Sequence, residues 1–163
     1  VTPWLRLFGN VAYIDGGIDN KAQFAAFAGD RFRLQPEWQA AAGLTVNADL
    51  GGGMRLFATP TVTYRSKIFF ELPNNPLISQ DAVTLAKARA GVSFADERFE
   101  IAGFVRNATD ENYLLDAGNT GGAFGIPTFI PAEPRFYGVQ AVARHVAQQC
   151  GLQHVFIDID NPA

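Results

Sequence analysis

The sequence has little cysteine, little charge and no long apolar run, and each shortage excludes a class of protein. Cys150 is the only cysteine among 163 residues, which rules out an internal disulfide framework. No apolar run approaches the roughly 18 residues that a membrane-spanning helix needs. Charged residues make up 18 % of the chain, below the roughly 25 % usual in soluble domains. The net charge of −3 is too weak and of the wrong sign for a protein that binds nucleic acid.

Aromatic and turn-forming residues are abundant instead. The chain contains 14 Phe, 4 Tyr and 2 Trp, together with 16 Gly and 9 Pro. These counts disfavour a helical bundle, a disordered tail and a small disulfide-rich domain, and they leave a β-rich protein. Because the chain starts at Val1 with neither a start methionine nor a signal peptide, we expect it to begin inside a longer protein.

Alternation of apolar and polar residues predicts about six long strands. They run from Leu5 to Tyr13, Trp38 to Asp49, Met54 to Arg65, Ala86 to Phe94, Phe99 to Arg106 and Arg135 to Val142. Strands of ordinary globular proteins average about five or six residues, whereas a tilted strand needs about 9–11 to cross a bilayer. The length of these strands is therefore typical of a membrane barrel.

The connections between the predicted strands alternate between short and long. Residues 49–53 and 95–98 are short turns, whereas 15–37, 66–81 and 108–134 are long loops. Loops of roughly 20 residues are rare in compact soluble domains. Outer-membrane barrels combine short turns on the periplasmic side with longer loops on the outer side.

Charge and aromatic residues also divide between the two predicted faces. The charged strand residues all belong to the polar set: Arg55, Arg65, Lys87, Arg89, Glu100 and Arg106. Aromatic residues lie near strand ends on the apolar set: Trp38, Tyr64, Phe94, Phe99 and Tyr137. A lipid-facing Arg at the bilayer midplane costs about 2–4 kcal/mol, while one that faces the lumen stays hydrated. We therefore predict an all-β fold, an antiparallel meander of about six long strands from a transmembrane β-barrel. A soluble β-sandwich binding module, which also alternates, is the alternative.

Four segments resemble TonB-dependent outer-membrane receptors. Residues 34–43 (LQPEWQAAAG) resemble a strand entry of that family, and 64–70 (YRSKIFF) followed by 74–76 (NNP) resemble a passage from strand to loop. Residues 106–113 (RNATDENY) are similar to a segment near the end of the family's barrel, and 134–139 (PRFYGV) are similar to its last strand. The resemblance covers residues 1–142.

This resemblance implies the C-terminal part of a barrel of about twenty-two strands in the bacterial outer membrane. Receptors of the family import ferric siderophores or similar scarce nutrients. The resemblance therefore implies three partners: outer-membrane lipid, a ferric chelate or similar ligand in the intact receptor, and the TonB complex. The family contacts TonB through an N-terminal part, with its plug, that this sequence lacks. About six strands cannot close a barrel, because the smallest barrels have about eight, so we expect a fragment.

The end of the sequence follows a different pattern. Helical spacing of Val142, Val146 and Ala147, followed by the apolar run 154–159, predicts a short C-terminal helix and strand in a foreign tail, 143–163. Residues 137–163 resemble the C-terminus of the dinuclear-metal-centre proteins, homologues of GTP cyclohydrolase type 2. A soluble hydrolase-like protein of that family is the second alternative. Glu133 lies near the position of a metal ligand in that family, but no His accompanies it, so the resemblance implies no metal site here.

The sequence offers no catalytic, cofactor-binding or metal-binding set. Asp158 and Asp160 share a face of the predicted strand and could form a weak site with His145 or His154, but a solvated strand edge is the favoured interpretation. For Cys150 no pairing with a His can be argued, so an incidental thiol is favoured over a nucleophile. The glycine-rich segments 51–53 and 121–125 lack the Lys-Ser/Thr of a phosphate loop. We therefore predict that the protein is not an enzyme.

One group of residues remains as a candidate ligand site. Arg55, Arg65, Lys87, Arg89 and Arg106 share the predicted lumen-facing side of the strands. In an intact barrel they could line the path of an anionic ligand such as a ferric chelate. Alternatively, they pair with carboxylates of a plug or of neighbouring strands.

Overall fold

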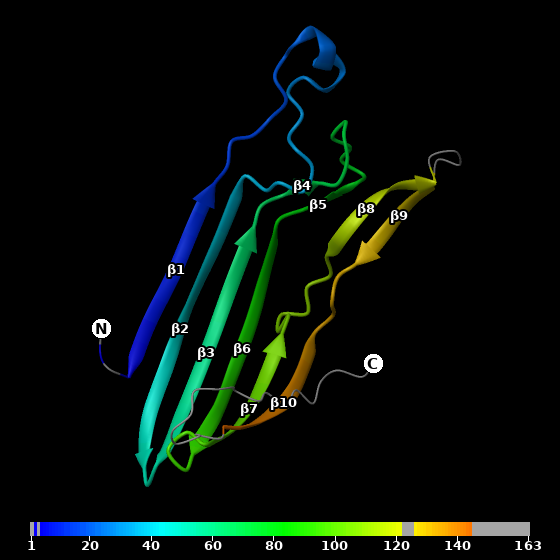
Figure 1. The fold of residues 1–163 in the computed structure, drawn as a ribbon. Coiled ribbons are helices and arrows are strands. Elements are labelled where there is room, and N and C mark those ends of the chain that lie inside the picture. Colours follow the sequence, from blue (N-terminus) through cyan, green and yellow to red (C-terminus); the bar gives the residue numbers. More distant parts are fainter. Residues whose placement is uncertain (1, 3, 122–125, 145–163) are drawn as a thin grey trace, which may run out of the picture.

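The computed structural model describes residues 2, 4–121 and 126–144, which form one curved sheet with long loops at one end (Figure 1). The sheet has six antiparallel strands in the order β1-β2-β3-β6-β7-β10. Their bounds are β1 Leu5–Tyr13, β2 Trp38–Gly51, β3 Met54–Arg65, β6 Val83–Phe94, β7 Phe99–Arg106 and β10 Phe136–Ala143. The predicted all-β meander of long strands is confirmed. The largest shift in a boundary is at β6, which begins at Val83 rather than Ala86.

The pairing register aligns the apolar sets of all six strands on one face. Across the sheet the partners are Leu5↔Val46, Val46↔Ala58, Ala58↔Ala90, Ala90↔Gly103 and Gly103↔Val139. Because side chains alternate along a strand, one matched row fixes the face of every other residue. We call the side that carries these residues the apolar face. The opposite side, which carries Arg55, Lys87 and Glu100, is the polar face.

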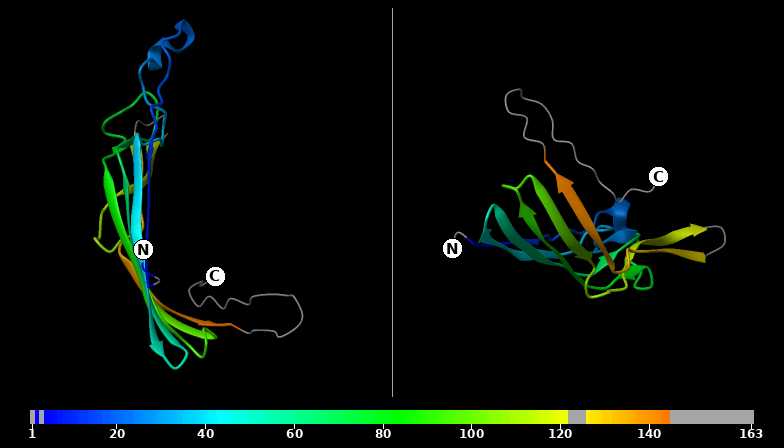
Figure 2. Two further views of the ribbon diagram at one scale, coloured as in Figure 1. Left: turned by 90° about the vertical axis from the view of Figure 1, so that its left-hand side faces the viewer. Right: turned by 90° about the horizontal axis from the view of Figure 1, so that it is seen from below.

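The apolar face is uncovered within the described chain. Leu7, Val11 and Val139 are 66 %, 69 % and 68 % exposed. Figure 2 shows a single curved layer, and the other two sheets of the described residues are two-stranded. A β-sandwich would cover such a face with a second sheet. The structure thus differs from the sandwich alternative.

Two tight turns connect strands at the end opposite the long loops. Gly51, Gly52 and Gly53 have φ values of 79°, 64° and 73°, which suit glycine at a turn. In the β6–β7 turn, Asp96 donates its backbone N–H to the Gly53 carbonyl at 3.2 Å. The Arg55 side chain also pairs with Glu97. The two turns therefore support each other.

The long connections contain structure that the alternation pattern did not reveal. We call residues 14–37 the first loop, 66–82 the middle loop and 107–135 the last loop. They contain the 3-10 helix η1 (Ala22–Phe27), the pair β4 (Ile68–Phe69) and β5 (Ser79–Gln80), and the hairpin β8 (Leu114–Gly121) and β9 (Ile126–Pro131). The prediction of the last loop as a plain loop was wrong there. No helix in the described residues is long and apolar enough to cross a membrane.

The predicted foreign tail lies almost wholly outside the described residues. Ala143 ends β10 and Arg144 follows it. The helical spacing included Val142, which the structure places in β10, so the prediction was wrong at that residue. The rest of the predicted helix and the predicted strand, with His145, Cys150, His154, Asp158 and Asp160, fall in 145–163, which the structure does not describe.

Glycines on the polar face make room for aromatic rings of the neighbouring strand. Gly43 lies opposite Phe8, and Gly138 lies opposite Phe104. A Cβ on Gly138 would lie 2.8 Å from the Phe104 ring, far inside van der Waals contact. A side chain at either position would displace the ring. At Gly43 the Pro60 carbonyl oxygen, 2.8 Å from the place of a Cβ, also stands in the way.

Substitution of Gly91 tests how closely β6 and β7 pack on the polar face. A Cβ there would lie 2.7 Å from Ala102 Cα and closer still to the Ile101 carbonyl oxygen. We expect Gly91→Ala to lower the free energy of unfolding by about 1–3 kcal/mol, as overpacking does elsewhere. Urea unfolding in detergent micelles, followed by tryptophan fluorescence, measures this change.

Gly103 is the matched control. Its Cβ would meet nothing closer than the Gly138 carbonyl oxygen at 3.9 Å. Gly103→Ala should change stability by no more than about 0.5–1 kcal/mol. Equal losses in both variants would contradict the steric argument.

Candidate functional site

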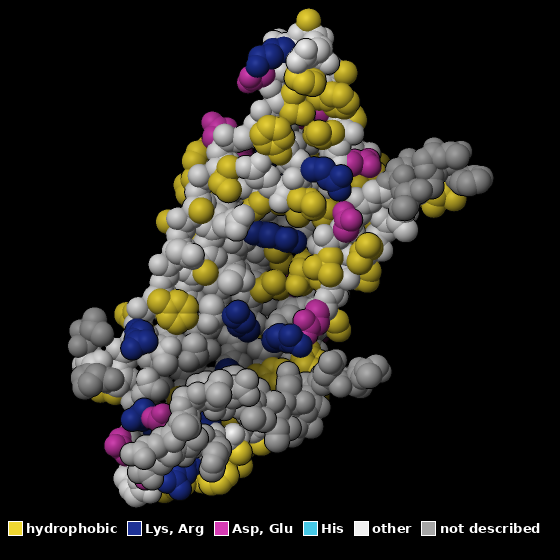
Figure 3. Space-filling model, in the orientation of Figure 1, with side chains coloured by type: hydrophobic (Ala, Val, Ile, Leu, Met, Phe, Trp, Pro, Cys, Tyr) yellow, Lys and Arg dark blue, Asp and Glu magenta, His cyan; other side chains and the backbone are white. Residues whose placement is uncertain are grey.

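The polar face carries the basic residues that the sequence singled out. Arg55, Arg65, Lys87, Arg89 and Arg106 all lie on it, in β3, β6 and β7. Figure 3 shows Lys and Arg side chains over the middle of the sheet on this face. All five lie on one face, as predicted. They differ in whether a carboxylate of the chain already neutralises their charge.

Three of these cations pair with carboxylates of the chain itself. Arg55 pairs with Glu97, Arg89 with Glu100, and Arg106 with Glu133 at 3.1 Å. Each guanidinium is partly exposed, so each pair contributes modestly to stability. The alternative of pairing with neighbouring-strand carboxylates thus applies to Arg89, whose partner lies on β7.

Glu100 is the centre of the strongest polar network. It is 8 % exposed, and its two oxygens bind Arg89 and Arg144, the latter at 3.1 Å. Arg89 also donates to Gln140 Oε1 at 3.0 Å. The network joins β6, β7 and β10. Sequence reasoning placed Glu100 on the right face. It did not identify Arg144 as a partner of Glu100 or Gln140 as a partner of Arg89, because these residues are distant in sequence.

The segment that most resembled the receptor family forms a closed turn. Asn107 is buried, with φ of 47°. Its Nδ2 donates to the carbonyls of Glu111 and Glu133, at 2.9 and 3.1 Å, and its Oδ1 accepts the Glu111 backbone N–H. Asp110 then accepts the backbone N–H of Arg135 at 3.2 Å and pairs with its side chain at 3.3 Å. These contacts close the base of the last loop, so the motif is structural.

Arg65 lies beside a cavity at the loop end of the polar face. Its Nη2 donates to the Leu114 carbonyl at 3.3 Å, and its guanidinium lies 5.8 Å from the Tyr113 ring centre. Within the described residues its buried Nε has no hydrogen-bond partner. A buried donor without an acceptor is unfavourable by about 1–3 kcal/mol, so this site would gain from an acceptor.

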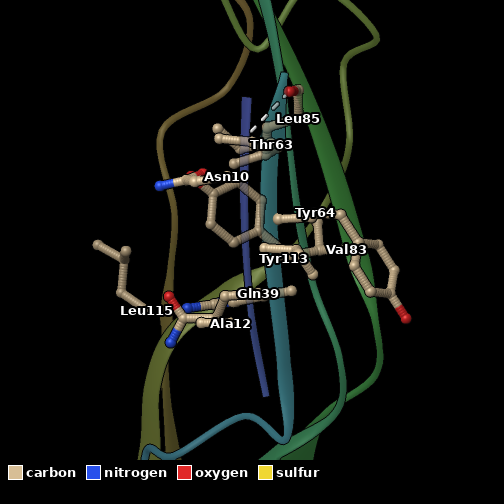
Figure 4. A pocket seen from close by; sticks show the side chains of 13 residues that line it. Asn10, Ala12, Gln39, Thr63, Tyr64, Val83, Leu85, Tyr113 and Leu115 are labelled. Atoms are coloured by element: carbon tan, nitrogen blue, oxygen red, sulfur yellow. Dashed lines mark hydrogen bonds between the residues drawn. The ribbon is translucent and has the colours of Figure 1, made fainter. Parts of the chain in front are cut away.

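The cavity has a volume of about 440 Å³ (Figure 4). Polar side chains reach it from three strands and the last loop: Asn10, Gln39, Thr63, Arg65 and Tyr113. In Figure 4 the Tyr64 ring points away from the others, as its place on the apolar face requires. The sequence did not single out Asn10, Gln39 or Tyr113, since only folding brings them together.

Of the five basic residues, Lys87 is the one whose positive charge is least offset by other groups of the chain. In the part of the chain that the structure describes, its ammonium has no hydrogen-bond or ion-pair partner. Ala88 lies opposite Val105, so the next residues on the polar face, Lys87 and Arg106, are cross-strand neighbours. The charge of Arg106 is offset by Glu133, whereas Lys87 has no such counter-charge in the described residues, so an anion beside Lys87 would be favourable.

No metal centre forms within the described residues, where no group of three His, Cys, Asp or Glu side chains converges. Glu133, the residue nearest to a metal ligand of the second resemblance, instead pairs with Arg106.

The two acidic residues Glu100 and Glu97 allow a matched test of the polar network. Glu100→Gln leaves Arg89 and Arg144 without a counter-charge. We expect the free energy of unfolding at neutral pH to fall by about 1–3 kcal/mol, less than for a fully buried pair because both arginines are partly exposed. Urea unfolding in detergent micelles measures the change.

Glu97→Gln is the control, because its pair with Arg55 is half-exposed on both sides. Its loss should be no more than about 1 kcal/mol. If Glu97→Gln were as damaging as Glu100→Gln, burial would not explain the importance of the Glu100 network.

Comparison with known proteins finds solved structures with a similar fold. No protein-family model matches the sequence, and no curated protein matches it. The solved structure of the ferric yersiniabactin uptake receptor FyuA from Yersinia pestis matches 85 % of the chain, with a TM-score of 0.72 and 19 % identity. BauA, the ferric preacinetobactin receptor from Acinetobacter baumannii, matches 86 %, with a TM-score of 0.66 and 19 % identity.

The chain spans about a fifth of each receptor, 20 % of FyuA and 19 % of BauA. At this level of identity the match concerns the fold, and it agrees with the fold expected from the receptor-like segments. In its fold, the chain is similar to a six-stranded segment of these two structures.

Proposed function

We propose that the chain is part of the barrel wall of a TonB-dependent receptor in the bacterial outer membrane. The complete receptor takes up a ferric siderophore or a similar scarce nutrient. One observation carries this proposal: a single-layer sheet with one face that carries no charged side chain, in the fold of two ferric siderophore receptors. In this role the chain is neither an enzyme nor the holder of a cofactor.

The apolar face has the dimensions of a lipid-facing surface. On β2 its residues extend from Trp38 to Ala48. At about 3.3 Å per residue and a tilt of about 45°, that stretch spans roughly 25 Å, the height of the apolar band of outer-membrane barrels. The exposed apolar side chains would then contact lipid.

Aromatic pairs mark both edges of this band. At the loop end, the rings of Tyr13 and Trp38 are 4.7 Å apart. At the turn end, Phe94 and Phe99 stack with ring centres 5.5 Å apart. Aromatic girdles of this kind lie at the two membrane–water interfaces of barrels. Their position supports outer-membrane lipid as a partner.

The other partners belong to the complete receptor. An N-terminal part outside this chain would contact the TonB complex, and a ferric chelate would pass along the polar face. Arg55, Arg89 and Arg106 are already paired, so the candidate ligand contacts narrow to two: Lys87 and Arg65. Both would favour an anionic ligand.

Two adjacent alanines of β2 provide the test of membrane insertion. Ala42 lies on the apolar face and Ala41 on the polar face. Ala42→Arg places a charge toward lipid and should destabilise the inserted protein by about 2 kcal/mol or more. The folded fraction in phospholipid vesicles, measured by urea titration, reports this loss.

Ala41→Arg carries the same change on the same strand but faces the lumen, so we expect a much smaller loss. If both variants inserted equally well, the apolar face would not face lipid, and the proposed location would be wrong.

Lys87 provides the test of ligand contact. In the complete receptor, Lys87→Gln should raise the KM for uptake of a negatively charged ferric chelate about three- to tenfold. The maximal rate should be little changed, because the lost interaction is electrostatic attraction. Uptake of radioactive iron by cells measures both values, and the effect should shrink at high ionic strength.

Lys67→Gln is the matched control, since the Lys67 ammonium already pairs with Asp81 at 3.1 Å. Equal KM values in the wild type and in Lys87→Gln would exclude Lys87 from the ligand path.

A further inference from the structure

The middle loop contacts both of the other long loops. It lies between them at the loop end of the sheet (Figure 1). In sequence it is separated from the first loop by all of β2 and β3, and from the last loop by β6 and β7. The contacts on its two sides differ in kind.

Asn74 makes the principal contact with the first loop. Its Oδ1 accepts the Arg31 backbone N–H at 2.7 Å, and its Nδ2 donates to the Arg31 carbonyl at 3.0 Å. The Asn74 backbone N–H donates to Asp30 Oδ2 at 3.1 Å. One side chain thus satisfies both backbone groups of Arg31, as a strand partner would.

The backbone supports the same junction. The Leu34 N–H donates to the Phe69 carbonyl at 2.8 Å, and Arg31 Nη2 reaches the Lys67 carbonyl at 3.4 Å. Beyond this junction η1 buries none of its residues. The base of the first loop is therefore held by the middle loop as well as by its own backbone bonds, such as that from the Ile14 N–H to the Glu37 carbonyl at 2.8 Å.

The contact with the last loop is apolar, with one polar anchor. Ile68, Phe70 and Ile78 of the middle loop form a buried cluster with Ala117 of β8, and Leu114 packs against it. Gln80 Oε1 accepts the Leu114 backbone N–H at 2.7 Å. Removing a member of such a cluster affects its neighbours, because protein interiors are closely packed.

We propose that the middle loop is a clasp that makes the three long loops one cooperative unit, with Asn74 as its positioning residue. This inference rests on the proposed function, in which these loops surround the outer mouth of the barrel. A ligand that orders one loop would then order all three, and loosening one would loosen the others. By linkage, the coupling between the first and last loops must act in both directions.

Hydrogen–deuterium exchange of the complete receptor in phospholipid vesicles tests the clasp. Asn74→Ala should speed exchange about tenfold in residues 30–35, where its partners lie. If the loops form one unit, exchange in residues 113–118 should also rise, although the hydrogen bonds of Asn74 among the described residues go to Asp30, Arg31 and Glu71. Gln80→Ala should speed exchange in residues 113–118, which contain its partner Leu114, and also in residues 30–35.

Asn75→Ala is the control. Among the described residues, the Asn75 side chain accepts one hydrogen bond, from the Leu77 N–H at 2.9 Å, within its own loop. Asn75→Ala should leave the exchange rates of residues 30–35 and 113–118 unchanged. Faster exchange in residues 30–35 alone after Asn74→Ala, or no change at all, would overturn the proposal.

If Asn74→Ala also disturbed β3 and β6, Asn74→Asp would be examined in its place, with the same two outcomes. It keeps the acceptor for the Arg31 N–H but loses the donor to the Arg31 carbonyl. Flotation of the wild type with the vesicles is measured separately. Failure to float would refute the proposed membrane location, whereas the exchange pattern alone decides the clasp.

Discussion

The pairing register of the six strands is the constraint on which the rest of the structure depends. Each strand carries an apolar and a polar set, and backbone pairing aligns all the apolar sets in the same rows. A slip of one residue at any ladder would turn every later side chain to the wrong side. It would move Lys87 and Arg89 onto the apolar face and expose Ala88 and Ala90 on the polar one. In the proposed barrel wall, the cost of a misplaced charge in lipid would select one register, and the tight turns would preserve it.

This constraint explains why the strands could be predicted from the sequence and the contacts between loops could not. Alternation is a local signal, so strands as long as β2 and β3 can be recognised without any knowledge of their neighbours. The hairpin β8–β9 was missed because its sequence, with Gly118 and Gly121 in one strand and Pro127 and Pro131 in the other, resembles a loop. The basic residues were placed correctly because the period of two fixes their face. Their partners were not, because Arg144 reaches Glu100 only after β10 has paired with β7.

The polar face shows how a wall can hold many cations without being uniformly attractive to anions. Arg89 is neutralised by Glu100 and also lies over the Phe57 ring, 4.9 Å from its centre. Arg106 combines an ion pair with Glu133 and a ring contact with Phe136 at 4.9 Å. Such cations are fixed in place and largely neutralised. Composition alone makes all five basic residues equal candidates for ligand contact. The contacts distinguish Arg89 and Arg106, whose charges are offset by carboxylates of the chain, from Lys87.

The loops must be stabilised differently from the sheet, because the six-stranded ladder does not extend to them. Among the described residues, the buried apolar cluster lies in the middle and last loops rather than on the sheet. Backbone groups of the first loop that lack a ladder partner are satisfied by Asn74 instead. Buried backbone groups must find partners, and a single amide side chain can supply both a donor and an acceptor. The requirement that backbone groups be hydrogen-bonded, which the ladder meets in the strands, thus joins loops that are far apart in sequence. This gives the outer end of the segment an order that its loop lengths alone do not suggest.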